Sequence, residues 1–236
     1  MSLRHAELKA GRALEHLEGL KRELQAYYNS NPCPVTLFKK PEIGRRFLRV
    51  DFTDLSDNAY LLVGDFAHNL RSVLDHIVYS LVVEATGAIP KSNTIQWPVL
   101  ISPNKKKFRK QTKGVPDAAA AIIDSHQPYH ATASGSAPKE HPLWQLHILD
   151  IVDKHRRVPV NEREFKAGFP TLSLSADFTK ESGDRYFEFS FPIDAPPVPM
   201  HYNPPVIRFG AGEESLFLTA DELDRIYQFV TQSVAS

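Results

Sequence analysis

Residues 57–85 form a long helical pattern that lacks Lys and Glu until its last turn. Apolar residues recur along it at three- and four-residue steps, which predicts one face buried in a core. Ser56 is placed to cap its start and Gly87 to close its end. Solvated helix faces usually carry Lys and Glu, because both are charged and favour helices. We therefore expect the opposite face to contact other protein groups.

Short hydrogen-bonding side chains occupy that opposite face. At about 100° per residue they form one contiguous arc. They are Asp65, His68, Asn69, Arg71, Ser72, Asp75, His76 and Tyr79. Arg71 and Asp75 are spaced to pair at i,i+4. Such a row suits either a buried polar network or a functional site, and the sequence leaves both open.

A second helix, expected from Pro142 to about Arg157, is apolar nearly all round and therefore predicted to be buried. Its few polar residues share one side, and a buried helix must satisfy such a stripe internally. We expect this stripe to face the polar side of helix 57–85. The two would then gather Arg71, Asp75, His76, His147, Asp150 and Lys154.

The remaining pattern predicts helices first and strands later. Further helices are expected at residues 3–28, 116–126 and after a capping box at Thr219–Glu222. Connectors are expected at 35–52, with weak strand character around Phe47–Phe52, and at 87–114, and a flexible loop is expected at 130–140. Alternation or β-rich composition predicts strands within 171–177, 185–191, 206–209 and 215–219.

This order predicts an α+β fold, with an N-terminal helical bundle followed by a small antiparallel sheet and a closing C-terminal helix. We expect residues 1–157 to form the bundle and residues 158–236 to form a strand-rich part packed on it, in a single compact unit.

Composition limits the class of protein. The chain is 42% hydrophobic and 24% charged with a formal net charge of zero, which is ordinary for a globular domain and unlike a strongly basic nucleic-acid binder. Cys33 is the only cysteine, so an internal disulfide and a Cys-based zinc site are excluded. A reducing, cytoplasmic location is expected, since no secretory signal or bilayer-length apolar stretch is evident, and no membrane partner is expected.

Two motifs carry a resemblance. The segment GDFAHNLRSVLDH (residues 64–76) and the tetrad DKHR (residues 153–156) resemble a group of poorly characterised bacterial proteins over about residues 10–157. Arg71 and His76 are also similar to the R-x4-6-H motif of HEPN-type proteins, a helical family that includes metal-independent ribonucleases and often places two motifs at a homodimer interface. Ser72 stands where these motifs commonly have Asn, and the strand-rich tail would be an addition to that fold.

The resemblance implies a protein that acts on nucleic acid, most concretely a metal-independent ribonuclease. His76 would take the 2′-hydroxyl proton and Arg71 would stabilise the charged phosphate. Supporting roles would fall to Asp65, Asn69, Ser72, Asp75, His147, Asp150 and Lys154. RNA phosphates would contact the basic run Lys105, Lys106, Lys107, Arg109 and Lys110, whose alternative interpretation is a solvated loop.

The same residues bear on other classes of function. The polar cluster contains metal-ligand types, but no HxxxH or HExxH pattern lies within it and Arg71 and Lys154 would repel a cation, so no metal is expected. GxSxG and Gly-rich phosphate loops are also absent, and no other cofactor is expected. The alternative to a ribonuclease is a non-catalytic ligand- or protein-binding domain with the polar face as a structural network, and whether the chain is an enzyme stays open.

Overall fold

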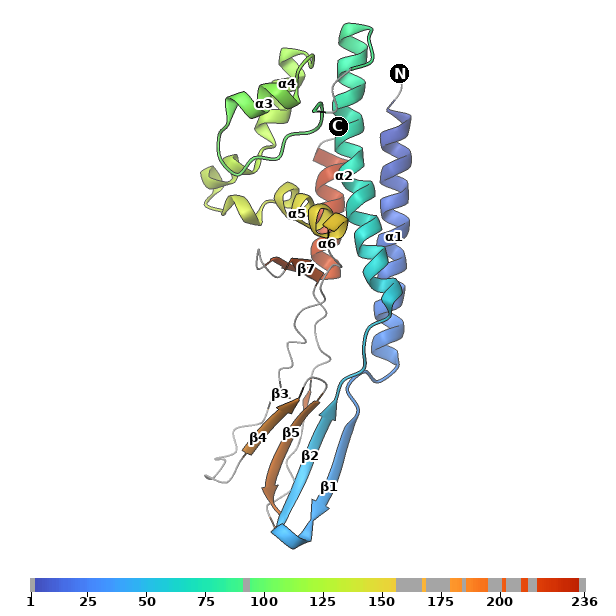
Figure 1. Cartoon of the computed structure of the whole chain (residues 1–236), viewed down its shortest axis with the longest axis vertical. Coiled ribbons are helices and arrows are strands. Elements are labelled where there is room, and N and C mark those ends of the chain that lie inside the picture. Colours follow the sequence, from blue (N-terminus) through green and yellow to red (C-terminus); the bar gives the residue numbers. More distant parts are fainter. Residues whose placement is uncertain are drawn as a thin grey trace. The chain divides into compact units, whose positions relative to one another are not determined.

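The structure is a computed structural model of an α+β protein (Figure 1). It describes residues 3–90, 94–155, 167–168, 179–183, 186–194, 201–202, 209–211 and 216–233. The chain divides into two compact units, each assembled from separated segments. Unit 1 contains residues 1–21, 58–161 and 208–236, and unit 2 contains residues 22–57 and 162–207. This division differs from the single compact unit, split near residue 157, that the sequence suggested.

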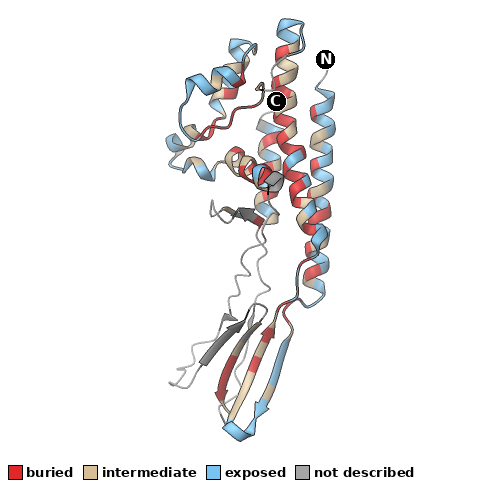
Figure 2. Ribbon diagram, in the orientation of Figure 1, coloured by how far each residue is buried: buried red, intermediate tan, exposed pale blue. Residues whose placement is uncertain are grey.

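Unit 1 is built around two long helices. α1 (Arg4–Asn29) contributes its residues up to Lys21, and α2 (Asp57–Thr86) follows it in the opposite direction. The predicted apolar stripe of α2 is buried from Val63 to Val78, as Figure 2 shows, because those residues recur on one side of the helix. Gly87 closes α2 with a φ of 66°, a left-handed conformation that glycine adopts without strain.

The other elements of unit 1 are shorter. They are α3 (Lys105–Gln111), α4 (Asp117–Ser125), the 3-10 turns η2 (Pro128–Ser134) and η3 (Pro138–Glu140), α5 (Pro142–His155), the paired strands β7 (Phe209–Ala211) and β8 (Leu216–Leu218), α6 (Ala220–Gln228) and a π-helical turn at Phe229–Ser233. The predicted capping box of α6 is confirmed: Thr219 N donates to Glu222 Oε2 at 2.7 Å, and Glu222 N donates to Thr219 Oγ1 at 3.3 Å.

Unit 2 holds a four-stranded antiparallel sheet in the order β1-β2-β5-β4. Its strands are β1 (Val35–Lys40), β2 (Arg45–Asp51), β4 (Thr179–Gly183) and β5 (Tyr186–Pro192). Leu48 of β2 lies opposite Phe189 of β5, and both are buried. β3 (Ala167–Gly168) pairs with β6 (His201–Tyr202). The sheet therefore combines an N-terminal hairpin with strands from the C-terminal half.

Three local predictions were wrong. Residues 35–51 are a hairpin closed through the turn Pro41–Ile43 and not a connector. The weak strand character expected around Phe47–Phe52 falls largely within β2, whereas β1 was missed because it is an exposed edge strand without hydrophobic alternation. Part of the connector 87–114 is the helix α3, whose N-cap Asn104 accepts from Lys107 N at 2.9 Å. Residues 130–140 form two 3-10 turns. The strand predicted within 171–177 lies outside the described residues.

Within the described ranges, no helix is long and apolar enough to cross a membrane.

Candidate functional site

The polar face of α2 meets three different neighbours within unit 1. One group of its side chains reaches the segment around Trp97, a second reaches α1, and a third reaches α5. This division follows from the width of the polar arc, since Arg71 and His76 are about 140° apart around the helix axis. The residues expected to gather at one point are therefore distributed over three contacts.

Arg71 and Asp75 hold the main chain of Trp97. Arg71 Nη2 donates to the Trp97 carbonyl oxygen at 2.7 Å, and the Trp97 amide donates to Asp75 Oδ1 at 2.9 Å. Arg71 Nη2 also lies 3.1 Å from Asp75 Oδ1, which confirms the predicted i,i+4 pair. Only 6% of Arg71 is exposed. Nη2 is thus committed to protein partners and the guanidinium faces little solvent, while the buried Nη1 has no hydrogen-bond partner among the described residues.

Asn69 and His76 face α1. Lys9 Nζ donates to Asn69 Oδ1 at 3.0 Å, and Asn69 Nδ2 donates to the carbonyl of Asp65 at 2.8 Å. The rings of His5 and His76 lie 6.0 Å apart between centroids. The exposed carboxylate of Asp65 lies 4.0 Å from His16. These contacts run in opposite directions along the two helices, so α1 and α2 are antiparallel neighbours here.

Asp150 of α5, a residue of the predicted second stripe, meets α2. It is 3% exposed, and His68 Nδ1 lies 3.3 Å from its Oδ1. Ser72 donates to the carbonyl of His68 at 2.8 Å, within its own helix. His147 lies beside Trp144, with ring centroids 5.7 Å apart. The side chain of Lys154 lies outside the described residues.

A shallow hollow of about 320 Å³ lies between α1 and α2. It is lined by His5, Leu8, Lys9, Arg12, Asn69 and His76. His5 and Arg12 are exposed, Lys9 and His76 are half-buried, and Arg12 Nη1 pairs with Glu15 at 2.6 Å. The hollow thus combines two imidazoles, an ammonium and a guanidinium on two adjacent helices.

The α1 residues of this hollow were not predicted, although the sequence carries a signal for them. His5, Lys9, Arg12 and His16 recur at four- and three-residue steps, so they form a basic stripe along one face of α1. The pattern of residues 3–28 predicted a helix but no site on it. Of the predicted site residues, His76 and Asn69 line the hollow, while Arg71 lies against Trp97.

The charge of the hollow affects His76. Burial lowers the pKa of His76 below its ordinary value of 6.5, and the neighbouring His5 and Lys9 lower it further. Asp75 acts in the opposite direction with a smaller effect. His76 is therefore neutral at pH 7, the state in which an imidazole can accept a proton.

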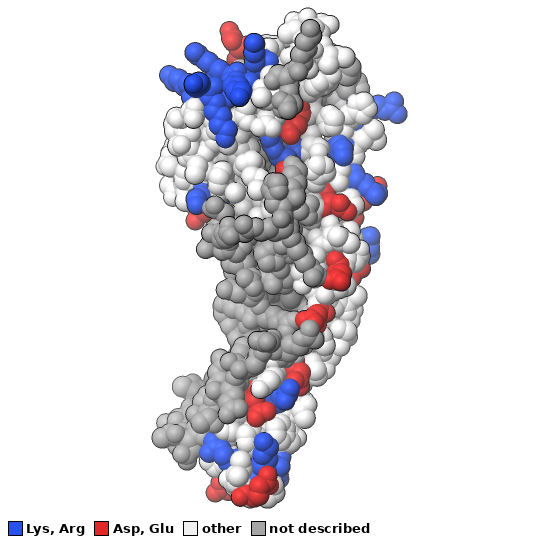
Figure 3. Space-filling model, viewed as in Figure 1, with Lys and Arg blue, Asp and Glu red and all other residues white. Residues whose placement is uncertain are grey.

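The basic run of α3 forms an exposed cluster (Figure 3). All five predicted phosphate-contacting residues, Lys105, Lys106, Lys107, Arg109 and Lys110, are exposed, and Phe108 is half-buried. A seven-residue helix with these side chains presents a positive surface, instead of the loop that the sequence suggested.

Among the described residues, no group of three or more His, Cys, Asp or Glu side chains is arranged to hold a metal ion. No protein-family model, curated protein or solved structure matches this chain.

Proposed function

We propose that this chain cleaves RNA without a metal ion, at the hollow between α1 and α2. The observation that carries the proposal is the pair of imidazoles, His5 and His76, with ring centroids 6.0 Å apart in a hollow that Lys9 and Arg12 also line. Two imidazoles at this separation can contact opposite sides of one phosphate group, and the cations match its charge.

The chemistry uses one proton acceptor and one proton donor. His76, which is neutral at pH 7, takes the proton of a ribose 2′-hydroxyl, and the 2′-oxygen attacks the adjacent phosphorus. The bond from phosphorus to the 5′-oxygen breaks, and His5, as the general acid, gives a proton to that leaving oxygen. The products are a 2′,3′-cyclic phosphate and a 5′-hydroxyl, so atoms and protons balance without a further reactant.

Lys9 and Arg12 stabilise the negative charge that grows on the phosphate oxygens. Arg12 releases Glu15 to do so, which costs little because both side chains of that pair are more than half exposed. The HEPN-like hypothesis gave this role to Arg71. The present proposal keeps His76 from that hypothesis and moves phosphate binding to α1, since Arg71 is buried against Trp97.

The α3 cluster supplies a second contact with RNA in this proposal. Its five exposed cations bind backbone phosphates without reading bases, so binding weakens steeply as salt concentration rises. A homodimer, implied by the HEPN resemblance, is not required for the chemistry at the hollow and stays a prediction.

The proposal is tested by incubating the purified chain with a defined single-stranded RNA in EDTA. His76→Ala and His5→Ala are expected to slow cleavage about 100-fold or more, which is typical for loss of a general base or acid. Lys9→Met should also slow it. His130→Ala is the matched control, because His130 is an exposed imidazole that lies 3.3 Å from Asp124 and outside the hollow.

Absence of cleavage by the wild-type chain would end the ribonuclease proposal. Cleavage that needs His76 and Arg71 but not His5 or Lys9 would favour the Arg71/His76 pair instead. Because Arg71→Ala disturbs Trp97, that comparison uses Arg71→Lys and includes a melting curve for each variant.

A further inference from the structure

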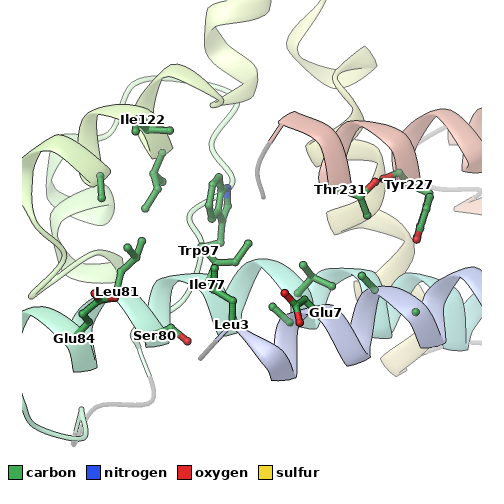
Figure 4. Close-up of a pocket in the computed structure, with 16 residues that line it drawn as sticks. Leu3, Glu7, Ile77, Ser80, Leu81, Glu84, Trp97, Ile122, Tyr227 and Thr231 are labelled. Carbon is green, nitrogen blue, oxygen red and sulfur yellow. Dashed lines mark hydrogen bonds between the residues drawn. The ribbon is translucent and has the colours of Figure 1, made fainter. Parts of the chain in front are cut away.

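A second cavity of about 560 Å³ lies in unit 1, and it shares no lining residue with the basic hollow (Figure 4). Its walls come from α1, α2, α4, the segment around Trp97 and the end of α6 with the turn that follows it. Lining residues include Val73, Ile77, Leu81, Ile122 and Ile123. Cavities of 300 to 1,000 Å³ with mostly apolar walls are typical of small-molecule sites, so this one is large enough for a ligand.

The cavity is elongated along α2. Glu84 lies toward one end and Tyr227 toward the other, with Trp97 between them (Figure 4). The α2 residues that line it run from Val73 to Glu84, which corresponds to about 16 Å of helix. An extended apolar body, such as an alkyl chain or a row of rings, fits this form.

The charged residues among those that line the cavity are both acidic. Glu7 of α1 and Glu84 of α2 are exposed, and no Lys or Arg is among the lining residues. Trp97 and Tyr227 add aromatic rings, which attract a cation through their faces. An apolar wall with carboxylates and aromatic rings therefore complements a cationic ligand better than a neutral or anionic one.

A buried hydrogen-bond donor also lacks a partner at this cavity. Trp97 is 2% exposed, and its Nε1 has no hydrogen-bond partner among the described residues. Its indole nitrogen lies on the ring edge turned toward Tyr227 and Thr231 (Figure 4). A buried donor without a partner is unfavourable, so an acceptor atom of a ligand at that position would be stabilised.

We propose that this cavity binds an elongated, mostly apolar molecule that carries a protonated amine, with Glu7 or Glu84 as the partner of the amine according to the orientation of the ligand, and Trp97 Nε1 as a donor to a polar atom of the ligand. This site is separate from the proposed ribonuclease centre, because Glu7, Ala10 and Gly11 lie on a different side of α1 from the basic stripe. Failure of one proposal leaves the other standing.

The test compares three probes of equal chain length by calorimetry at pH 7: octylamine, octanol and octanoate. We expect octylamine to bind most tightly and octanoate most weakly. The double variant Glu7→Gln/Glu84→Gln should lower the affinity for octylamine about 5-fold, because an exposed charge pair contributes an effect of about that size. Its affinity for octanol should stay unchanged.

Two further variants change the cavity without disturbing the fold. Gly11→Leu should abolish binding, since a Cβ at Gly11 meets nothing within 4 Å and leucine favours the helix more than glycine does. Ile122→Lys should reverse the preference toward octanoate, and Ile122→Gln is its neutral control, because Ile122 is 59% exposed.

Equal binding of octylamine and octanol, tighter binding of octanoate, or unchanged binding in Gly11→Leu would overturn the proposal. Sedimentation is run beside the calorimetry. A dimer that Gly11→Leu dissociates, with no probe bound by the wild type, would mean that a second copy of the chain covers the cavity, and would also overturn it.

Discussion

Arg71 and Trp97 are joined by a hydrogen bond of 2.7 Å from a side chain to a main-chain carbonyl, in a place that water barely reaches. Asp75 binds the other main-chain group of the same residue, because its carboxylate accepts a hydrogen bond from the Trp97 amide. The two polar side chains of one helix turn thus fix both main-chain groups of a residue that lines the larger cavity. This part of the polar face joins α2 to the main chain at Trp97.

Removal of Arg71 should destabilise the fold. Arg71→Met leaves the Trp97 carbonyl and the Asp75 carboxylate without this partner, and we expect a loss of about 2–4 kcal/mol in the free energy of unfolding. Urea denaturation followed by tryptophan fluorescence measures it. Arg109→Met on exposed α3 is the control and should change stability by less than about 0.5 kcal/mol. Equal stability of the two variants would contradict the structural role of Arg71.

Acid should destabilise the chain through His141. Its Nδ1 accepts from the amide of Leu143 at 3.2 Å, at the start of α5, and burial first and His126 second lower the pKa of His141 to about 4. The unfolded chain therefore binds the proton more tightly than the folded chain. Stability from this group is complete above about pH 6.5 and is lost as the pH falls toward about 4.

The size of this effect should be about 1–2 kcal/mol, because His141 is only half-buried and solvent screens its surroundings. Urea denaturation at several pH values between 7 and 4 measures it. In His141→Asn, an acceptor that does not titrate stays at the start of α5, so the fall should become shallower. An identical fall in wild type and variant would assign the acid sensitivity elsewhere.

Loss of the Asp150 carboxylate should also weaken the fold. Asp150→Ala leaves a small void where a 3% exposed side chain lay and removes the partner of His68, so we expect a loss of about 1–3 kcal/mol. Thermal denaturation against Lys106→Ala, an exposed substitution, provides the comparison. An unchanged melting temperature would show that the contact between α2 and α5 contributes nothing.

The pH dependence of RNA cleavage should report on His76. Because its pKa is lowered, the rising limb of the rate should lie below pH 6.5, where the neutral imidazole first predominates. Lys9→Met removes one of the charges that lower this pKa, so the limb should move to higher pH even though the maximum rate falls. A limb that stays in place would mean that the titrating group is not His76.

The long helices were predictable because their signals are local. The stripe of α2 from Val63 to Val78 is set by spacing alone, and the closing Gly87 and the Thr219 capping box act within a few residues. The hairpin at residues 35–51 escaped prediction because β1 is exposed and β2 is completed by β5, a strand far along the chain. Pairing between strands that lie so far apart along the chain cannot be predicted from a short segment of sequence.

The candidate sites were predictable only in part, because local sequence signals identified a helix face but not its neighbours. Periodicity identified the polar face of α2, but it could not tell which neighbour each side chain would meet, because an arc of about 140° is wide enough for several. The partnership of His5 with His76 and the commitment of Arg71 to Trp97 both depend on how distant segments pack. The larger cavity is lined by residues from five separate segments, so no single sequence motif predicts it.

The attachment of Trp97 to Arg71 and Asp75 complicates any genetic dissection of this chain. In a screen for loss of activity, substitutions of Arg71 would rank among the most damaging even if the guanidinium never contacts a substrate. The reason is that such a substitution removes a hydrogen bond that holds Trp97, a residue that lines the larger cavity. Assigning a chemical role to this arginine therefore requires a variant whose tryptophan environment matches that of the parent.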